Sequence, residues 1–180
     1  ALPITGGTIP VMPHGRLILE SDLQEVLDAL NSQGLFNWEG LTAAEVRAKL
    51  AAVKTPVTTP HVDRIDDLSI PGPDGNVIPC RLYHPSPGSL LPLIVWLHGG
   101  GWVLGGLDGE ESTARQLATI GDIAVLSIDY RLAPEHRFPA AFQDSRSSFL
   151  WAVDHAADLG ASTVAIGGAS AGGNLAAAVS

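Results

Sequence analysis

The sequence predicts an α/β fold with a largely parallel central sheet. Three apolar runs, at residues 90–97, 123–128 and 163–166, have the composition of strands buried on both faces of a sheet. Helical patterns stand between them, at residues 112–120 and 139–157. Strands that alternate with helices in this way are typical of a mostly parallel sheet covered by helices.

Two further strands are predicted ahead of this alternating part of the chain. Residues 64–70 and 77–84 have strand composition, and Pro73-Asp74-Gly75-Asn76 between them is a turn-forming cluster. The single cysteine, Cys80, falls in the second strand, so no disulfide within the chain is possible. We interpret Cys80 as a small buried hydrophobic residue.

The first 60 residues are expected to form an irregular arm, residues 1–15, followed by two helices. In the second helix, Thr42 and Glu45 have the spacing of a capping box, and the apolar face extends as far as Lys54. The first helix is predicted from apolar residues that fall on one face: Leu19, Leu23, Val26, Leu27 and Leu30. We therefore divide the chain into residues 1–60 and residues 61–180.

Composition and charge exclude several classes of protein. The 180 residues carry a net charge of −9 and no basic run, which argues against binding to nucleic acid or to anionic membranes. No apolar stretch is long enough to span a bilayer, and no secretory signal stands at the start. A soluble cytoplasmic protein is expected. The scattered histidines lack the spacing of a metal site, so neither metal nor cofactor is expected.

Residues 168–172, Gly-Ala-Ser-Ala-Gly, match the G-x-S-x-G pattern of a nucleophile elbow, with Ser170 as the nucleophile. They follow an apolar strand and open a helix, which is the strand–turn–helix context that an elbow requires. A sharp turn leaves no room for side chains two residues either side of the serine. The pattern alone also fits a helix-capping serine or an anion-binding turn. A phosphate loop would need a lysine that is absent.

Residues 98–102, His-Gly-Gly-Gly-Trp, follow the first buried strand. Consecutive glycines let backbone N–H groups approach an oxyanion closely, which is what stabilises a tetrahedral intermediate in acyl transfer. A plain flexible glycine loop would not call for a histidine and a tryptophan as flanks. His98 is a candidate general base, but its place in the loop favours a scaffold role, with hydrogen bonds that hold the glycines.

Four motifs, taken together and in their order along the chain, resemble the hormone-sensitive-lipase-like esterases of the α/β-hydrolase fold. The first is the glycine loop, and the last is the elbow, which continues as Gly173-Asn174-Leu175. Between them lie residues 129–135, Asp-Tyr-Arg-Leu-Ala-Pro-Glu, and residues 138–141, Phe-Pro-Ala-Ala, with Asp144. The resemblance covers most of residues 64–180, and it implies that the N-terminal helices form a cap over the active site and shape the acyl pocket. Arg131 and Glu135 are expected to make buried charge-assisted contacts.

Carried over residue by residue, the resemblance implies Ser170 as the nucleophile and the N–H groups of Gly100, Gly101 and Ala171 as the oxyanion hole. The family's catalytic Asp and His lie well beyond the elbow, so no residue here is assigned to those roles. We therefore expect the chain to be a segment of a longer polypeptide, truncated after the elbow at Ser180.

The sequence thus predicts a serine carboxylesterase that hydrolyses short- to medium-chain acyl esters through an acyl-serine intermediate. Its partner is a small-molecule ester, and homodimerisation is an open alternative to a monomer. A non-catalytic ligand-binding receptor on the same scaffold is a second hypothesis, because the residue that decides between the two is not in this sequence. An amide or peptide hydrolase is a third, although the glycine loop favours esters. Acyl-chain preference, stereoselectivity and the physiological substrate cannot be inferred.

Overall fold

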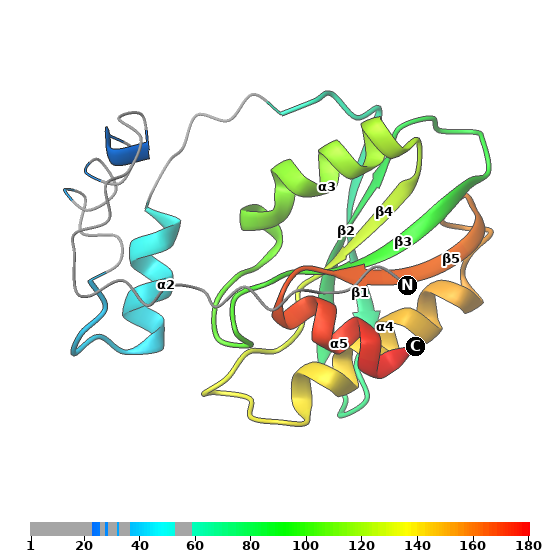
Figure 1. Cartoon of the computed structure of the whole chain (residues 1–180). Helices are drawn as coiled ribbons and strands as arrows, with labels where there is room; N and C mark the ends of the chain where they lie inside the picture. Colours follow the sequence, from blue (N-terminus) through cyan, green and yellow to red (C-terminus); the bar gives the residue numbers. More distant parts are fainter. Residues whose placement is uncertain (1–22, 26–27, 29–31, 33–36, 53–58) are drawn as a thin grey trace, which may run out of the picture. The chain divides into compact units, whose positions relative to one another are not determined.

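The computed structural model describes residues 23–25, 28, 32, 37–52 and 59–180 (Figure 1). The chain forms two compact units, residues 1–40 and 41–180. In the first unit the described residues between 23 and 32 are helical, and Gln24 Nε2 donates to Asp28 Oδ1 at 2.8 Å. The arm of residues 1–15 and most of the predicted first helix, including Leu19, Val26, Leu27 and Leu30, lie outside the described residues.

The second unit begins with helix α2, Ala43–Ala51. The predicted capping box is confirmed: the Glu45 N–H donates to Thr42 Oγ1 at 3.3 Å, and the Thr42 N–H donates to Glu45 Oε2 at 2.7 Å. Val46 is the buried residue of this helix. The assignment of residues 1–60 to a cap stays a prediction.

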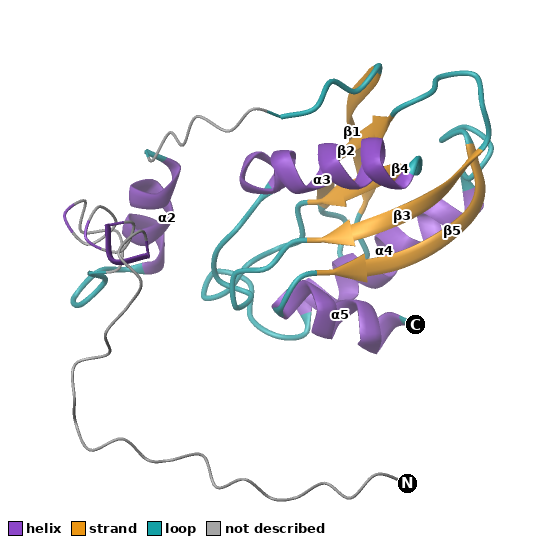
Figure 2. Ribbon diagram, turned by 45° about the horizontal axis from the view of Figure 1, so that its top comes forward, coloured by secondary structure: helices purple, strands orange, loops and turns teal. Residues whose placement is uncertain are grey.

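A five-stranded mixed sheet forms the centre of the second unit, in the order β1-β2-β4-β3-β5. β3, β4 and β5 are parallel, as predicted, whereas β2 pairs antiparallel with both β1 and β4 (Figure 2). The turn between β1 and β2 is closed by the Gly72 N–H, which donates to the Asn76 carbonyl at 2.7 Å. The strands are β1 Arg64–Pro71, β2 Val77–His84, β3 Leu91–Leu97, β4 Ala124–Ile128 and β5 Ala161–Gly168.

Helices cover both faces of this sheet (Figures 1 and 2). Helix α3, Leu107–Gly121, lies on one face, and helices α4, Ala140–Asp154, and α5, Ala171–Val179, lie on the other. α3 begins five residues earlier than the sequence pattern indicates, and α4 ends at Asp154. Within the described part of the chain, no helix combines the length and apolar character that crossing a membrane requires.

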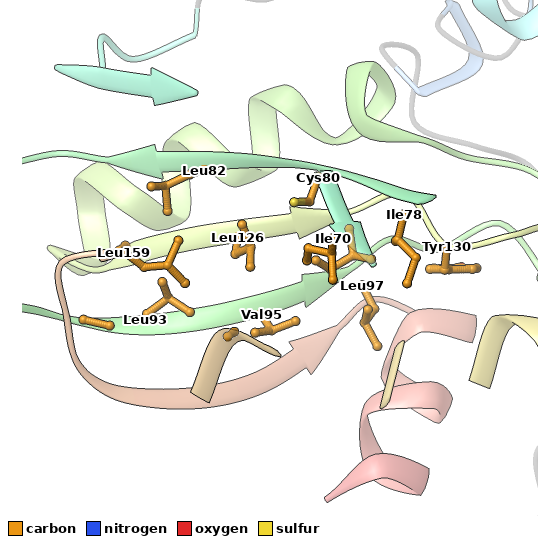
Figure 3. Packing of buried hydrophobic residues seen from close by; sticks show 14 of the residues in the cluster. Ile70, Ile78, Cys80, Leu82, Leu93, Val95, Leu97, Leu126, Tyr130 and Leu159 are labelled. Atoms are coloured by element: carbon orange, nitrogen blue, oxygen red, sulfur yellow. The ribbon is translucent and has the colours of Figure 1, made fainter. Parts of the chain in front are cut away.

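The two sides of the sheet bury alternate residues of each strand. The larger core lies toward α4 and α5 and includes Cys80, Leu82, Val95 and Leu126, which Figure 3 shows converging from three strands. The smaller core, which contains Tyr83 and Val125, packs against Ala114 and Ala118 of α3. Every residue of β4 is buried, because this strand has neighbours on both edges and helices on both faces.

The carboxyl ends of the three parallel strands lie next to one another. Leu97, the last residue of β3, pairs with Ile128 of β4 and with Gly168 of β5. The loops that follow these strands therefore begin side by side. This edge is where open α/β sheets place their ligand sites.

Substitution Leu126→Ala tests the central position of β4. The Leu126 side chain is fully buried, so its removal is expected to lower the free energy of unfolding by about 2–5 kcal/mol. Urea denaturation of the whole protein measures this change. Val77→Ala, at a position that is 63% exposed, is the control and is expected to stay within about 0.5 kcal/mol of the parent. Equal losses for the two variants would contradict this account of the core.

Cys80 gives a chemical test of the same core. Its side chain is fully buried, and burial raises the pKa of the thiol to about 12, so the reactive thiolate is absent at pH 8. We expect the tryptic peptide that carries Cys80 to stay unalkylated by iodoacetamide in the native protein and to be fully alkylated in urea. Rapid alkylation of the native protein at pH 8 would place Cys80 outside the core.

Candidate active site

Ser170 lies in the sharp turn between β5 and α5, with backbone angles of φ 49° and ψ −113°. This conformation is unfavourable for any residue with a Cβ and costs on the order of 1–3 kcal/mol. Ser170 occupies the N-cap position of α5, yet its side chain makes no capping hydrogen bond, and the residue is exposed. The alternative of a plain helix-capping serine is therefore wrong, because the hydroxyl is held away from the helix.

The two glycines that flank Ser170 are required by the close approach of α5 to β3. A Cβ on Gly172 would overlap the carbonyl oxygen of Leu97, and a Cβ on Gly168 would lie 2.7 Å from the Gly172 oxygen. The Ala169 N–H also donates to the Leu97 carbonyl at 3.1 Å. The glycines predicted from the elbow pattern thus allow the turn to sit directly on the end of β3.

The glycine loop after β3 folds into a tight turn around the carbonyl oxygen of Gly100. The N–H groups of Val103 and Leu104 both donate to this oxygen, at 3.1 and 2.8 Å. Gly100 and Gly101 have φ values of 118° and 62°, which lie in the region that glycine adopts without strain. A Cβ on Gly100 would collide with Leu104, so glycine is required there for space as well.

The glycine loop and the elbow lie against each other. A methyl group on Gly99 would be 3.2 Å from the Ala169 carbonyl oxygen and 3.6 Å from Ser170 Cβ. Among the described residues, the backbone N–H groups of Gly100, Gly101 and Ala171 have no acceptor. Ala171 is the first residue of α5, so its N–H precedes the hydrogen bonds of the helix, and the helix dipole adds partial positive charge there.

His98 is fully buried and acts as a scaffold for the loop, as predicted from the sequence. Its Nδ1 lies 2.7 Å from the Gly99 carbonyl oxygen, and its ring stacks on Tyr130 with the ring centres 4.2 Å apart. The Tyr130 hydroxyl donates to the His98 carbonyl at 2.7 Å. Because Nδ1 is engaged with the backbone and the ring is sandwiched in the core, His98 is not placed to act as the base.

Residues 129–135 are held by a charge cluster centred on Asp144 of α4. The carboxylate of Asp144 is fully buried and accepts from Arg131 Nε at 2.9 Å, Nη2 at 2.8 Å and the Arg131 N–H at 3.0 Å. A second carboxylate, Asp74, lies 2.9 Å from Arg131 Nη2. The expected buried contact of Arg131 is thus confirmed.

Glu135 differs from the expectation, because its ion pair lies at the surface. It pairs with Arg47 of α2 at 2.9 Å, and the Glu135 side chain is 47% exposed. The hydrogen bond from Arg47 lowers the pKa of Glu135, so this carboxylate is charged at neutral pH. Arg47 carried no signal in the sequence, since its partners are up to 88 residues away.

Gly105 is a second residue that the sequence did not single out. It has a φ of 102°, and a Cβ there would lie 2.6 Å from the Gly99 carbonyl oxygen and 2.7 Å from His98 Cε1. Gly105 therefore packs directly against Gly99 and the His98 ring, where no side chain would fit. Two adjacent glycines, Gly105 and Gly106, are visible in the sequence ahead of α3. The pair could have indicated this close packing, but it is equally typical of an ordinary loop before a helix.

A hollow of about 770 Å³ lies beside the loop, bounded by Arg47, Leu50 and Ala51 of α2 and by residues 104–110. Asp129 also lines it, and burial raises the pKa of this carboxyl, with nearby His98 opposing the rise. Ser170 is not among its lining residues. Its wall combines the apolar side chains of Leu50, Leu104 and Leu107 with charged ones such as Arg47, Arg81 and Asp129.

The other histidines of the described part make no hydrogen bond to Ser170. His84 is buried beside Gly160, His155 stacks on Trp151 at the end of α4, and His136 is exposed. His61 is exposed as well, and His14 lies outside the described residues. No described side chain hydrogen-bonds to the Ser170 hydroxyl. The described residues therefore supply a serine and N–H donors, without a base.

Known proteins resemble this chain in sequence and in fold. A family model described as the α/β-hydrolase fold matches residues 94–180. Carboxylic ester hydrolase LipN of Mycobacterium tuberculosis (strain ATCC 25618 / H37Rv) is 48% identical over 159 residues, which cover 83% of this chain and 42% of LipN. This chain has the α/β-hydrolase fold and is similar to the hormone-sensitive-lipase-like family of carboxylesterases.

Other members of this family give the same result. Carboxylesterase NlhH of the same M. tuberculosis strain is 40% identical over 165 residues, 89% of this chain and 51% of NlhH. A solved ester hydrolase, EH1AB1 from the metagenome of Lake Arreo, superimposes with a TM-score of 0.79 at 34% identity, covering 90% of this chain and 54% of that one. The chain thus spans about half the length of these α/β hydrolases.

The close approach at Gly172 predicts opposite effects of two glycine substitutions in helices. Gly172→Ala forces a methyl group into the Leu97 carbonyl and is expected to lower the free energy of unfolding by about 1–3 kcal/mol. Gly109→Ala in α3 has open space around the new Cβ and is expected to raise it by up to about 1 kcal/mol. Thermal unfolding of the two variants measures the difference. Stability changes of the same sign would contradict the fit of α5 against β3.

Proposed function

We propose that the protein is a serine carboxylesterase that hydrolyses short- to medium-chain acyl esters. The observation that carries this proposal is the exposed Ser170 hydroxyl, held by a strained turn beside N–H groups that have no acceptor among the described residues. A serine kept at a backbone cost and without a capping bond is what a nucleophile requires. The ester-hydrolase names of LipN, NlhH and EH1AB1 support the same reaction.

In the proposed reaction, Ser170 Oγ attacks the ester carbonyl carbon and its proton passes to a base. The carbonyl oxygen becomes negative and accepts hydrogen bonds from the N–H groups of Gly100, Gly101 and Ala171. Collapse of this intermediate expels the alcohol, which takes up the proton, and leaves an acyl-serine. Water then adds to the acyl group in the same way and releases the acid and the free serine.

The base in this scheme lies outside the described residues. His98 is fully buried, with Nδ1 engaged by Gly99 and its ring stacked on Tyr130, and none of the described histidines hydrogen-bonds to Ser170. A serine without a base is a weak nucleophile at neutral pH. We therefore propose a histidine, oriented by a carboxylate, from another part of the whole protein. Homodimerisation and a cytoplasmic location stay predictions of the sequence.

Substitution Ser170→Ala tests the proposed nucleophile. Turnover of p-nitrophenyl acetate and butyrate by the whole protein is expected to fall by at least about 10³-fold, since only binding and the oxyanion hole remain. Ser69→Ala, at an exposed serine of β1, is the matched control and should keep full turnover. A fluorophosphonate probe followed by peptide mass spectrometry should label Ser170 in the parent alone.

The outcomes of this experiment separate the hypotheses. Equal rates for the parent and Ser170→Ala would remove Ser170 as the nucleophile. Ester binding without turnover, in both proteins, would favour the ligand-binding receptor instead. Faster cleavage of p-nitroanilides than of the matching esters would favour an amide hydrolase.

A further inference from the structure

The side chain of Arg47, in α2, bonds to the loop that carries Gly100 and Gly101. Its Nε donates to the Val103 carbonyl at 2.6 Å, and its Nη2 donates to the Ala133 carbonyl at 2.6 Å. Nη1 and Nη2 also donate to the two oxygens of Glu135, both at 2.9 Å. A single guanidinium thus joins three segments that are far apart in sequence.

The backbone of the loop is restrained at adjacent residues by this junction. The Trp102 carbonyl accepts from the Ala133 N–H at 2.8 Å, and the next carbonyl, that of Val103, accepts from Arg47. Val103 in turn donates to the Gly100 carbonyl at 3.1 Å, which closes the turn that orients Gly100 and Gly101. Movement of Val103 would therefore change the direction of the Gly100 and Gly101 N–H groups, which are the proposed oxyanion hole.

The planar geometry of the guanidinium makes this junction selective for arginine. The bidentate pair with Glu135 fixes the plane of the guanidinium, which places Nε and Nη2 against the two carbonyl groups. Lysine has no planar fork and could satisfy the carboxylate or one carbonyl, but not this whole set. The Arg47 side chain is 27% exposed, so part of its attraction to Glu135 is screened by water, and geometry matters more than charge alone.

We propose that Arg47 is a positioning residue that couples the docked state of α2 to the geometry of the oxyanion loop. The proposal rests on the proposed esterase function for its effect on turnover, although the coupling itself is a property of the fold. When α2 is docked, Val103 is held and the N–H groups of Gly100 and Gly101 are aligned. When α2 leaves, the loop loses this restraint while Ser170 keeps its own support from β3.

Variant Arg47→Met tests the coupling, because methionine retains much of the apolar stem and removes every donor. The substrate is p-nitrophenyl acetate, whose small acyl group makes few contacts. We expect kcat to fall about tenfold and KM to change less than about twofold. This loss of kcat is smaller than the roughly 10²–10³-fold loss that follows deletion of an oxyanion-hole donor. Arg47→Lys is expected to recover little of kcat. Added methylguanidinium should restore turnover of Arg47→Ala, which leaves the space of the side chain empty, and should leave the parent unchanged.

Arg115→Met is the matched control. The Arg115 side chain is 18% exposed and also binds a carboxylate and a carbonyl, those of Glu111 and Pro60, away from the oxyanion loop. It is expected to keep the parent kcat and to show no response to methylguanidinium. Glu135→Gln, which keeps the carbonyl partners of Arg47, should give an intermediate kcat.

Amide hydrogen exchange provides a readout that does not depend on turnover. In Arg47→Met, peptides covering residues 43–51 and residues 99–106 are both expected to exchange faster than in the parent. Faster exchange in residues 43–51 alone, or an unchanged kcat in an active protein, would overturn the coupling. Absence of esterase activity in the parent would instead contradict the proposed function, and the exchange result would still decide the role of Arg47.

Discussion

The carbonyl oxygen of Leu97 lies where side chains on residues 168 and 172 would otherwise stand. This close approach lets the first turn of α5 rest on the last residue of β3. Since β3 lies between β4 and β5 in the sheet, its end is fixed by neighbours on both edges. The position of Ser170 relative to the glycine loop follows from this contact, because the loop starts at the end of β3 and the elbow, which follows β5, rests against the same strand end.

Beyond that contact, the loop depends on a chain of polar and aromatic supports. Tyr130 stacks on His98 and binds its carbonyl, and the next residue, Arg131, is anchored by the buried Asp144 of α4. A buried carboxylate is costly unless it is paired and hydrogen-bonded, and Asp144 meets both conditions. Segment 129–135 thereby transmits the position of α4 to the oxyanion loop. Arg47 adds a contribution from the opposite side, through α2.

The fold and the centre of the site could be predicted from the sequence because their signals are local. The glycines at 168 and 172 lie within two residues of Ser170, and each of the two loops directly follows its own apolar run. The antiparallel pairing of β2 with β4 was not visible, since it joins strands about 45 residues apart with no turn between them. Arg47 and Gly105 were missed for a similar reason, because their meaning depends on atoms that only folding brings close.

Segment 129–135 also shows why a motif can be found without its physical role. Its sequence suggested charged contacts for both Arg131 and Glu135, yet only Arg131 reaches a buried partner. Burial depends on which helix lies behind each residue, and spacing alone does not contain that information. The local sequence pattern therefore identifies the segment, whereas tertiary packing determines whether each of its charged side chains is buried or exposed.

The backbone conformation of Ser170 has a consequence for the evolution and engineering of this chain. At φ 49° and ψ −113° a glycine would sit without strain, so the residue that gives the site its hydroxyl is also a residue that weakens the fold. Selection for thermal tolerance alone would thus favour loss of the serine. Under the proposed function, its presence here marks a trade-off between stability and activity, located at a single residue.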